Sequence, residues 1–218
     1  MELTQAQIAE LFRFTEKKFV HWYDLQVELV DHLASSIEAE WEQEPGLSFE
    51  AALDRVYRRF GIFGFAKVVQ EKSEGLYRAS RRMWWQEVRA FFSWPRISIV
   101  FALSAVLWQL TQWVPTDWLL IGLAVAYLSS GIATLYFYRR RTAPKKKLML
   151  LGVGPAHFSG TVFIYQTFLF SGHERYSPVF FCLLALFGII VHVASYKVYM
   201  KVRAQAERQY PEAFVKAA

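Results

Sequence analysis

Four side chains that can bind metals or partners fall close together on one expected helix. They are Asp24, Glu28, Asp31 and His32. Glu28 and His32 stand four residues apart, a spacing that places two side chains on one face of a helix. Such a face could hold a divalent metal, dock a protein partner or simply be solvated. We expect no metal, treat partner docking as the functional hypothesis, and expect His32 to be semi-buried.

Two histidines form a second candidate site inside apolar segments. His157 lies ten residues after Lys147, and His192 lies nine residues before Lys201. Both imidazoles would therefore lie roughly 15 Å from the same edge of a membrane, at about 1.5 Å per helical residue. The pattern favours a polar contact between helices that includes Ser159 and Ser195. Haem or metal ligation, quinone contact and a substrate or proton path are the alternatives, and we expect no bound cofactor.

The sequence contains none of the common catalytic motifs. It contains no Gly-rich phosphate loop, no GxSxG, no HExxH and no pair of carboxylates within an apolar segment. The single cysteine, Cys182, lies ten residues from His192, nearly three helical turns away and too far for a catalytic pair. These observations predict a protein that is not an enzyme.

Charge divides the chain into an acidic part and a basic part. Residues 1–74 carry fourteen Asp and Glu against eight Lys and Arg, a net charge of −6. The remainder carries +12, which gives the overall +6. The surplus Lys and Arg flank apolar segments, as expected of topology signals. We therefore expect no nucleic-acid partner.

Four apolar segments are long enough to cross a membrane as helices, which takes roughly 20 residues. They are 97–114, 118–137, 148–170 and 178–200. Gly, Pro and His interrupt the first half of the third, and this predicts a kink buried inside the bundle. The expected fold class is all-α, with a small N-terminal cytoplasmic helical domain followed by a four-helix transmembrane bundle.

Orientation follows from the bias of Lys and Arg toward cytoplasmic loops. Basic and aromatic residues expected at the cytoplasmic interface are Arg81, Arg82, Trp84, Trp85, Arg139, Arg140, Arg141, Lys145, Lys146 and Lys147. The two other connections are short and hold one basic residue, Arg175. The sequence thus predicts a multi-pass protein in contact with lipid in a cytoplasmic (inner) membrane, with both termini in the cytoplasm.

Residues 1–74 read as a soluble domain of three helices. Thr4 and Gln7 resemble a capping box, Ser48 is a good N-cap, and Gly61 ends the third helix. In the second helix, from about residue 24 to 43, Leu25, Leu29, Leu33, Ile37 and Trp41 step by four. We expect a basic and aromatic juxtamembrane helix over 75–96 and a cytoplasmic tail over 201–218.

The segment YDLQVELVDHLASSIEAEWEQEPGLSFEAALDRVYRRFG resembles the HAAS-type helical signalling domains that are fused to bacterial membrane spans. It also resembles membrane proteins of Bacteroidetes-type bacteria that carry a YD-Q-ELVDHLAS-IE helix. The resemblance covers roughly residues 10–72, departs from the pattern at His32, and does not extend to the spans. It implies a regulatory or partner-binding module without catalysis.

Together these features predict a non-enzymatic membrane protein whose cytoplasmic helical domain docks a protein partner. It would act as a regulatory or accessory subunit of a membrane complex. The alternative is a small membrane redox or transport subunit that uses His157 and His192.

Overall fold

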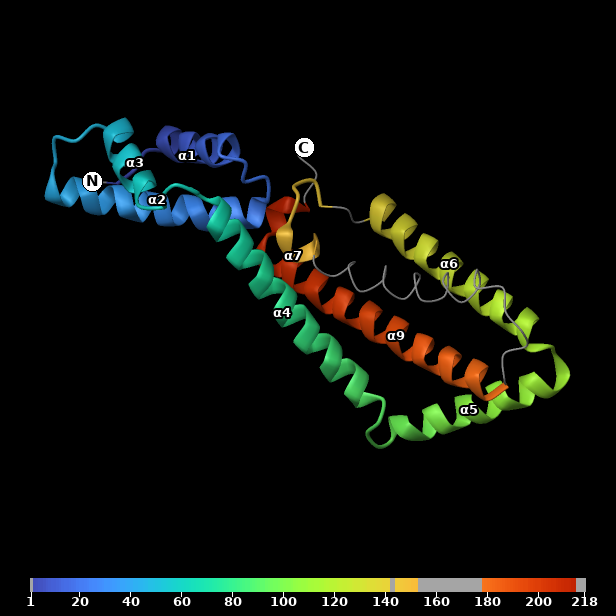
Figure 1. The fold of residues 1–218 in the computed structure, drawn as a ribbon. Coiled ribbons are helices and arrows are strands. Elements are labelled where there is room, and N and C mark those ends of the chain that lie inside the picture. The colour runs from blue at the N-terminus through green and yellow to red at the C-terminus, as the bar shows by residue number, and fades with distance from the viewer. Residues whose placement is uncertain (1, 142–143, 153–177, 215–218) are drawn as a thin grey trace. The chain divides into compact units, whose positions relative to one another are not determined.

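The computed structural model describes residues 2–141, 144–152 and 178–214, and every regular element in these ranges is helical. The all-α fold class is therefore confirmed for the described part of the chain. The chain divides into two compact units (Figure 1). Unit 1 comprises residues 1–77, 144–150 and 206–218, and unit 2 comprises residues 78–143 and 151–205.

Unit 1 is built around three helices and the start of a fourth. The elements are α1 (Gln5–Lys17), α2 (Tyr23–Gln43), α3 (Phe49–Arg58), the first turns of α4 (Ala66–Ala90), and the 3-10 helix Pro211–Ala213. The sequence placed the domain boundary at residue 74 and assigned 144–150 and 206–218 to other regions. The structure adds both of these later segments to unit 1.

Two of the three expected helix signals are present, whereas the third helix ends at Arg58 with Arg59 as its C-cap, two residues before Gly61. The Thr4 side chain accepts a hydrogen bond from the Gln7 amide, and the Gln7 side chain accepts one from the Thr4 amide, which confirms the capping box. The Ser48 hydroxyl accepts a hydrogen bond from the Ala51 amide at the start of α3. These local bonds satisfy backbone groups that a helix start otherwise leaves without partners.

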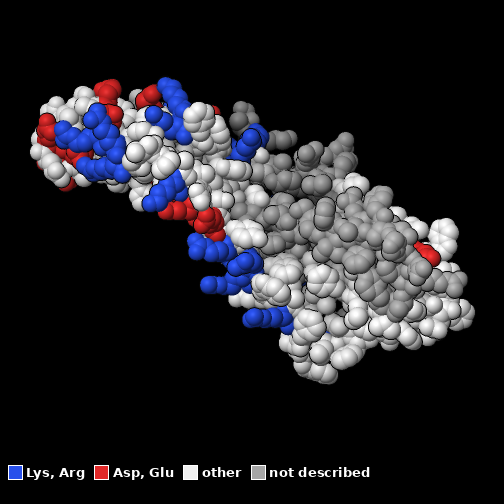
Figure 2. Space-filling model, viewed as in Figure 1, with Lys and Arg blue, Asp and Glu red and all other residues white. Residues whose placement is uncertain are grey.

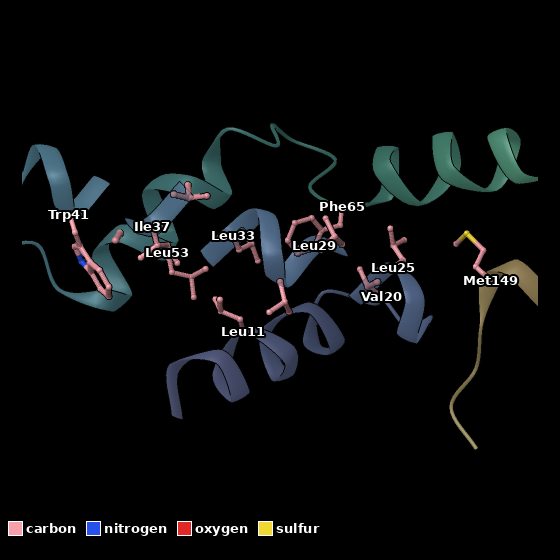
Figure 3. Close-up of a cluster of buried hydrophobic side chains, with 13 residues drawn as sticks. Leu11, Val20, Leu25, Leu29, Leu33, Ile37, Trp41, Leu53, Phe65 and Met149 are labelled. Atoms are coloured by element: carbon pink, nitrogen blue, oxygen red, sulfur yellow. The ribbon is translucent and has the colours of Figure 1, made fainter. Parts of the chain in front are cut away.

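A stripe of apolar residues on α2 forms the core of unit 1. All five residues of the predicted stripe, Leu25, Leu29, Leu33, Ile37 and Trp41, are buried. They pack with Leu11 of α1, Leu53 of α3, Phe65 and Met149 (Figure 3). Because burying such a side chain contributes about 1.5–3 kcal/mol, this cluster supplies much of the driving force for folding unit 1.

Two glycines with positive φ shape the connection from α3 to α4. Gly61 has a φ of 73° and Gly64 a φ of 51°, values that residues other than glycine rarely adopt. A Cβ on Gly64 would also lie 2.3 Å from the Tyr57 hydroxyl. The resulting turn buries Phe65 and leaves Ile62 and Phe63 exposed.

A buried carboxylate ties α2 to the end of α3. The Glu40 side chain is buried, and it forms ion pairs with Arg55, at 3.0 Å, and with Arg59. The hydrogen bond from Arg55 and the bond and charge of Arg59 hold the pKa of Glu40 below its ordinary value.

Unit 2 contains the second half of α4, α5 (Arg96–Trp113), α6 (Thr116–Arg141) and most of α9 (Pro178–Gln209). The short helix α7 (Met149–Gly152) spans the boundary between the units. Within unit 2, Cys182 and Ala185 of α9 pack with leucines of α5 and α6. Figure 2 shows basic side chains following one another along the second half of α4, the expected juxtamembrane helix.

Among the described residues, one helical segment, Cys182–Gln209, is long and apolar enough by length and composition to cross a membrane. It contains most of the fourth expected span. The first expected span is the 18-residue α5, in which Gln109, Thr111 and Gln112 lower the mean hydropathy. Most of the third expected span lies outside the described residues, so the four-helix bundle stays a prediction.

The low pKa of Glu40 predicts how unit 1 responds to acid. A group whose pKa is lowered by folding stabilises the fold above its unfolded value near 4.5, and this contribution is lost as the pH falls below that value. Replacing Glu40 with Gln should therefore reduce the fall in melting temperature between neutral pH and about pH 3.5. Tryptophan fluorescence of the full chain in detergent measures this, with Glu42→Gln, an exposed site on the same helix, as the matched control. An unchanged pH profile in Glu40→Gln would contradict the assigned role.

Candidate functional site

The carboxylate of Asp24 holds a distant segment of the chain against the start of α2. Its Oδ1 accepts a hydrogen bond from the Met149 amide at 2.9 Å, and its Oδ2 accepts one from the Leu150 amide at 2.9 Å. The Leu25 amide also donates to Oδ1, at 3.2 Å. Asp24 itself is buried. A buried carboxylate needs such donors, because removing it from water without them is costly.

Backbone hydrogen bonds connect the start of α2 to residues 145–147, and these in turn to the 3-10 helix Pro211–Ala213. The Tyr23 amide donates to the Lys147 carbonyl at 2.8 Å, and the Lys145 amide donates to the Ala213 carbonyl at 2.8 Å. We call this set the junction, comprising Tyr23, Asp24, residues 145–150 and residues 210–213. It joins the start of α2, the segment that leads into the third expected span with the first three residues of that span (148–150), and the tail after the fourth.

Two tyrosines pack at the junction. The rings of Tyr23 and Tyr210 have centroids 6.4 Å apart. Burial, followed by a hydrogen bond to Glu212, raises the pKa of Tyr23, and burial together with the charge of Asp24 raises the pKa of Tyr210. Both phenols are therefore protonated at neutral pH, and the Tyr23 hydroxyl donates its hydrogen bond to Glu212.

The four residues expected to form a docking patch have different environments. Asp24 is committed to the junction, and Glu28 forms an ion pair with Lys72. Asp31 and His32 are exposed. The expectation that His32 is semi-buried is wrong. The residues of α2 that face the core in this region are Leu25, Leu29 and Leu33, and His32 lies off that face.

An exposed apolar surface lies elsewhere on unit 1. Three large side chains, Phe19, Ile62 and Phe63, are 82%, 101% and 78% exposed. They border a groove of about 570 Å³ whose other wall is the face of α4 formed by residues 66, 69, 70, 73 and 74. We call this surface the apolar groove. Sequence reasoning missed it, although GIFGF places two large apolar residues between glycines, which is an unusual composition for a turn.

Phe19 occupies a backbone position that normally favours glycine. Its φ is +66°, its amide donates to the Glu16 carbonyl at 2.9 Å, and the next amide, Val20, donates to the Thr15 carbonyl at 3.1 Å. These two bonds form a Schellman motif at the end of α1, in which glycine is the usual residue at this position. An aromatic side chain is thus kept in a strained conformation while exposed to solvent, a combination that points to function rather than stability.

The polar groups of unit 2 link α4 to α9. Trp84 Nε1 donates to the hydroxyl of Ser195 at 3.0 Å, and Ser195 is buried. Glu87 pairs with Lys201 at 2.5 Å and with Lys197 at 3.8 Å, and the bond from Lys201 holds the pKa of Glu87 below its ordinary value. Ser195 therefore contacts a residue of the expected interface helix.

The rest of the intramembrane candidate site is only partly visible. His192 is half-buried on α9. His157 and Ser159 lie outside the described residues, as do the side chains of Arg139, Arg140 and Arg141. The described residues contain no group of three or more His, Cys, Asp or Glu side chains arranged to hold a metal ion.

The interface residues that the structure describes lie on exposed surface in most cases. Arg81, Arg82 and Trp85 on α4 are exposed, and so are Lys145, Lys146 and Lys147. Trp84 is half-buried through its contact with α9.

The junction predicts a large effect from a small chemical change. Asp24→Asn keeps the shape of the side chain but turns one acceptor oxygen into a donor that faces a backbone N–H group. We expect the free energy of unfolding of unit 1 to fall by about 1–3 kcal/mol, the cost of a buried donor without an acceptor. Urea unfolding of the full chain in detergent measures this. Asp31→Asn, at an exposed site on the same helix, is the control and should change stability by less than about 0.5 kcal/mol. Equal effects of the two substitutions would contradict the role of Asp24.

Comparison with known proteins leaves the chain without an assigned family. No protein-family model, no curated protein and no solved structure matches it.

Proposed function

We propose that this chain is a non-enzymatic, multi-pass protein of a bacterial cytoplasmic membrane, with both termini in the cytoplasm, whose helical domain docks a protein partner. It acts as a regulatory or accessory subunit of a membrane complex. The resemblance of residues 10–72 to HAAS-type signalling domains is consistent with this role. The observation that carries the docking proposal is the apolar groove with its exposed Phe19, Ile62 and Phe63.

The surface of unit 2 supports a lipid environment for more than one helix. Beyond Arg96, α5 carries no charged residue, and no residue of α5 is buried. Its exposed side chains include Ile99, Phe101 and Trp113. Helix α6 likewise exposes large apolar residues, among them Trp118 and Ile132. Water-soluble proteins rarely expose apolar area on this scale, whereas lipid-facing helices do.

The segments that make up unit 1 support the proposal that both chain termini lie on the same side of the membrane. Residues 144–147, between the second and third proposed spans, belong to the same unit as the N-terminal helices, as do the first three residues of the third span (148–150) and residues 206–214 after the fourth. Segments packed in one small domain must lie on one side of a membrane. Because residues 144–150 and α4 are rich in Lys and Arg, that side is the cytoplasm.

The shape of the apolar groove suits a helix of the partner. Residues 66, 69, 70, 73 and 74 recur at the spacing of one helical face, so the groove runs beside α4 over more than two turns. An amphipathic helix can place its apolar face in such a groove, with aromatic side chains at the rim as anchors. Phe19, Ile62 and Phe63 are positioned to be these anchors.

Phe19→Gly separates docking from stability. Glycine relieves the positive φ, so we expect the domain to keep its stability or to gain about 1 kcal/mol. Docking should weaken by about tenfold or more, since an exposed aromatic anchor is lost. The measurement is photo-crosslinking in intact membranes with a photoreactive residue at position 62, in chains with and without the Phe19→Gly substitution, combined with melting curves.

The control places the same photoreactive residue at exposed position 42 on α2, away from the apolar groove. The proposal expects one discrete adduct from position 62, much weaker in Phe19→Gly, and none from position 42. Equal labelling from both positions, or full labelling in Phe19→Gly, would refute docking at this groove.

A further inference from the structure

A second hollow of unit 1 lies beside the junction. It measures about 520 Å³ and is open to solvent. Its wall includes Arg13 and Glu16 of α1, His21 and Tyr23 at the entry to α2, and Lys146 and Lys147. We call it the basic hollow. Three stretches of sequence that are far apart in the chain therefore contribute side chains to one concave surface.

The basic hollow is locally positive within an acidic domain. Three cations, on Arg13, Lys146 and Lys147, face one carboxylate, on Glu16. Arg13 forms an exposed ion pair, at 3.2 Å, with Glu10 three residues earlier on the same helix. Such exposed pairs contribute little to stability. The guanidinium of Arg13 therefore loses little by turning toward an anion in the hollow.

The junction fixes the backbone that carries the two lysines. The Lys147 carbonyl accepts a hydrogen bond from the Tyr23 amide at 2.8 Å. Just beyond Lys147, the amides of Met149 and Leu150 donate hydrogen bonds to the Asp24 carboxylate. The Lys146 ammonium lies 3.7 Å from the centre of the Tyr23 ring, within the range of a cation–π contact. Because the backbone at Lys147 and the ammonium group of Lys146 are held before any ligand arrives, an anion binding here would lose less energy in ordering this segment.

We propose that the basic hollow binds the phosphate of an anionic phospholipid headgroup in the cytoplasmic leaflet. One guanidinium and two ammonium groups that line the same hollow suit a phosphate, and the rings of Phe12 and Tyr23 supply an apolar wall beside it. This inference rests on the membrane placement proposed above. Lys147 directly precedes the third proposed span, which begins at residue 148, and helix α7 starts two residues after it, at Met149.

The domain as a whole does not suit a polyanion. Residues 1–74 carry a net charge of −6, which would repel an extended nucleic acid but leaves a single headgroup free to enter one positive hollow. Basic pockets on the cytoplasmic side of membrane proteins commonly bind lipid headgroups. Binding at this point would fix unit 1 to the membrane surface through the residues that begin the third span.

The test is a titration of the full chain in detergent with phosphatidylglycerol, followed by native mass spectrometry, with phosphatidylcholine as the neutral lipid. Arg13→Gln and Lys147→Gln should each weaken phosphatidylglycerol binding about fivefold, the effect of roughly 1 kcal/mol per basic residue. Lys17→Gln removes the same charge from an exposed site on α1 outside the hollow and should leave binding unchanged. Arg13 is on an exposed helix surface, so its replacement should leave the melting temperature unchanged.

The outcomes separate the lipid site from the other proposals. Equal binding by Arg13→Gln, Lys147→Gln and Lys17→Gln overturns the site, as does no preference over phosphatidylcholine. Inorganic phosphate that displaces the lipid at an equal concentration assigns the hollow to free phosphate and also overturns it. Phe19→Gly should bind lipid normally, so loss of docking in that variant concerns the partner groove alone. Release of the wild-type chain from membranes by alkaline carbonate would instead refute the membrane placement.

Discussion

The fold of unit 1 depends on one buried carboxylate. Asp24 lies at the start of the helix that supplies the largest share of the core, and its two oxygens accept hydrogen bonds from the amides of Met149 and Leu150. Without this acceptor, these two residues at the start of the third proposed span would place backbone donors next to α2 with no partner. The carboxylate thus turns a chain segment more than a hundred residues away into part of the N-terminal domain. Met149 then completes the apolar core beside Leu25.

This constraint organises one of the two surfaces for which we propose a function. Because the junction fixes the backbone at Lys147, it positions the lysines of the basic hollow next to Tyr23. The apolar groove is formed separately, by the Schellman turn at Phe19 and by the two glycines around Ile62 and Phe63. One domain therefore carries two surfaces of different chemistry, a positive one suited to a lipid phosphate and an apolar one suited to a helix.

Sequence reasoning succeeded where structure follows from local signals and failed where it follows from distant contacts. The capping box at Thr4, the N-cap at Ser48 and the leucine stripe of α2 were predicted, because each depends on residues within a few turns. The role of Asp24 was not predicted. It accepts a hydrogen bond from a residue 125 positions away in the chain, and no local sequence pattern indicates such a contact. Phe19 was missed for another reason: its αL conformation has no glycine to signal it. The basic residues at 145–147 were read only as topology signals, although the fold also brings two of them to a hollow.

The most direct test of the account is amide hydrogen exchange at the junction in the full chain in detergent. If Asp24 holds the distant segment as described, peptides covering 144–150 and 206–213 should exchange as slowly as the core of α2 between Leu25 and Trp41. Their protection should also be lost together with that of α2 as urea is added. Exchange of these two peptides within seconds, while α2 stays protected, would contradict the account, because unit 1 would then consist of the N-terminal helices alone.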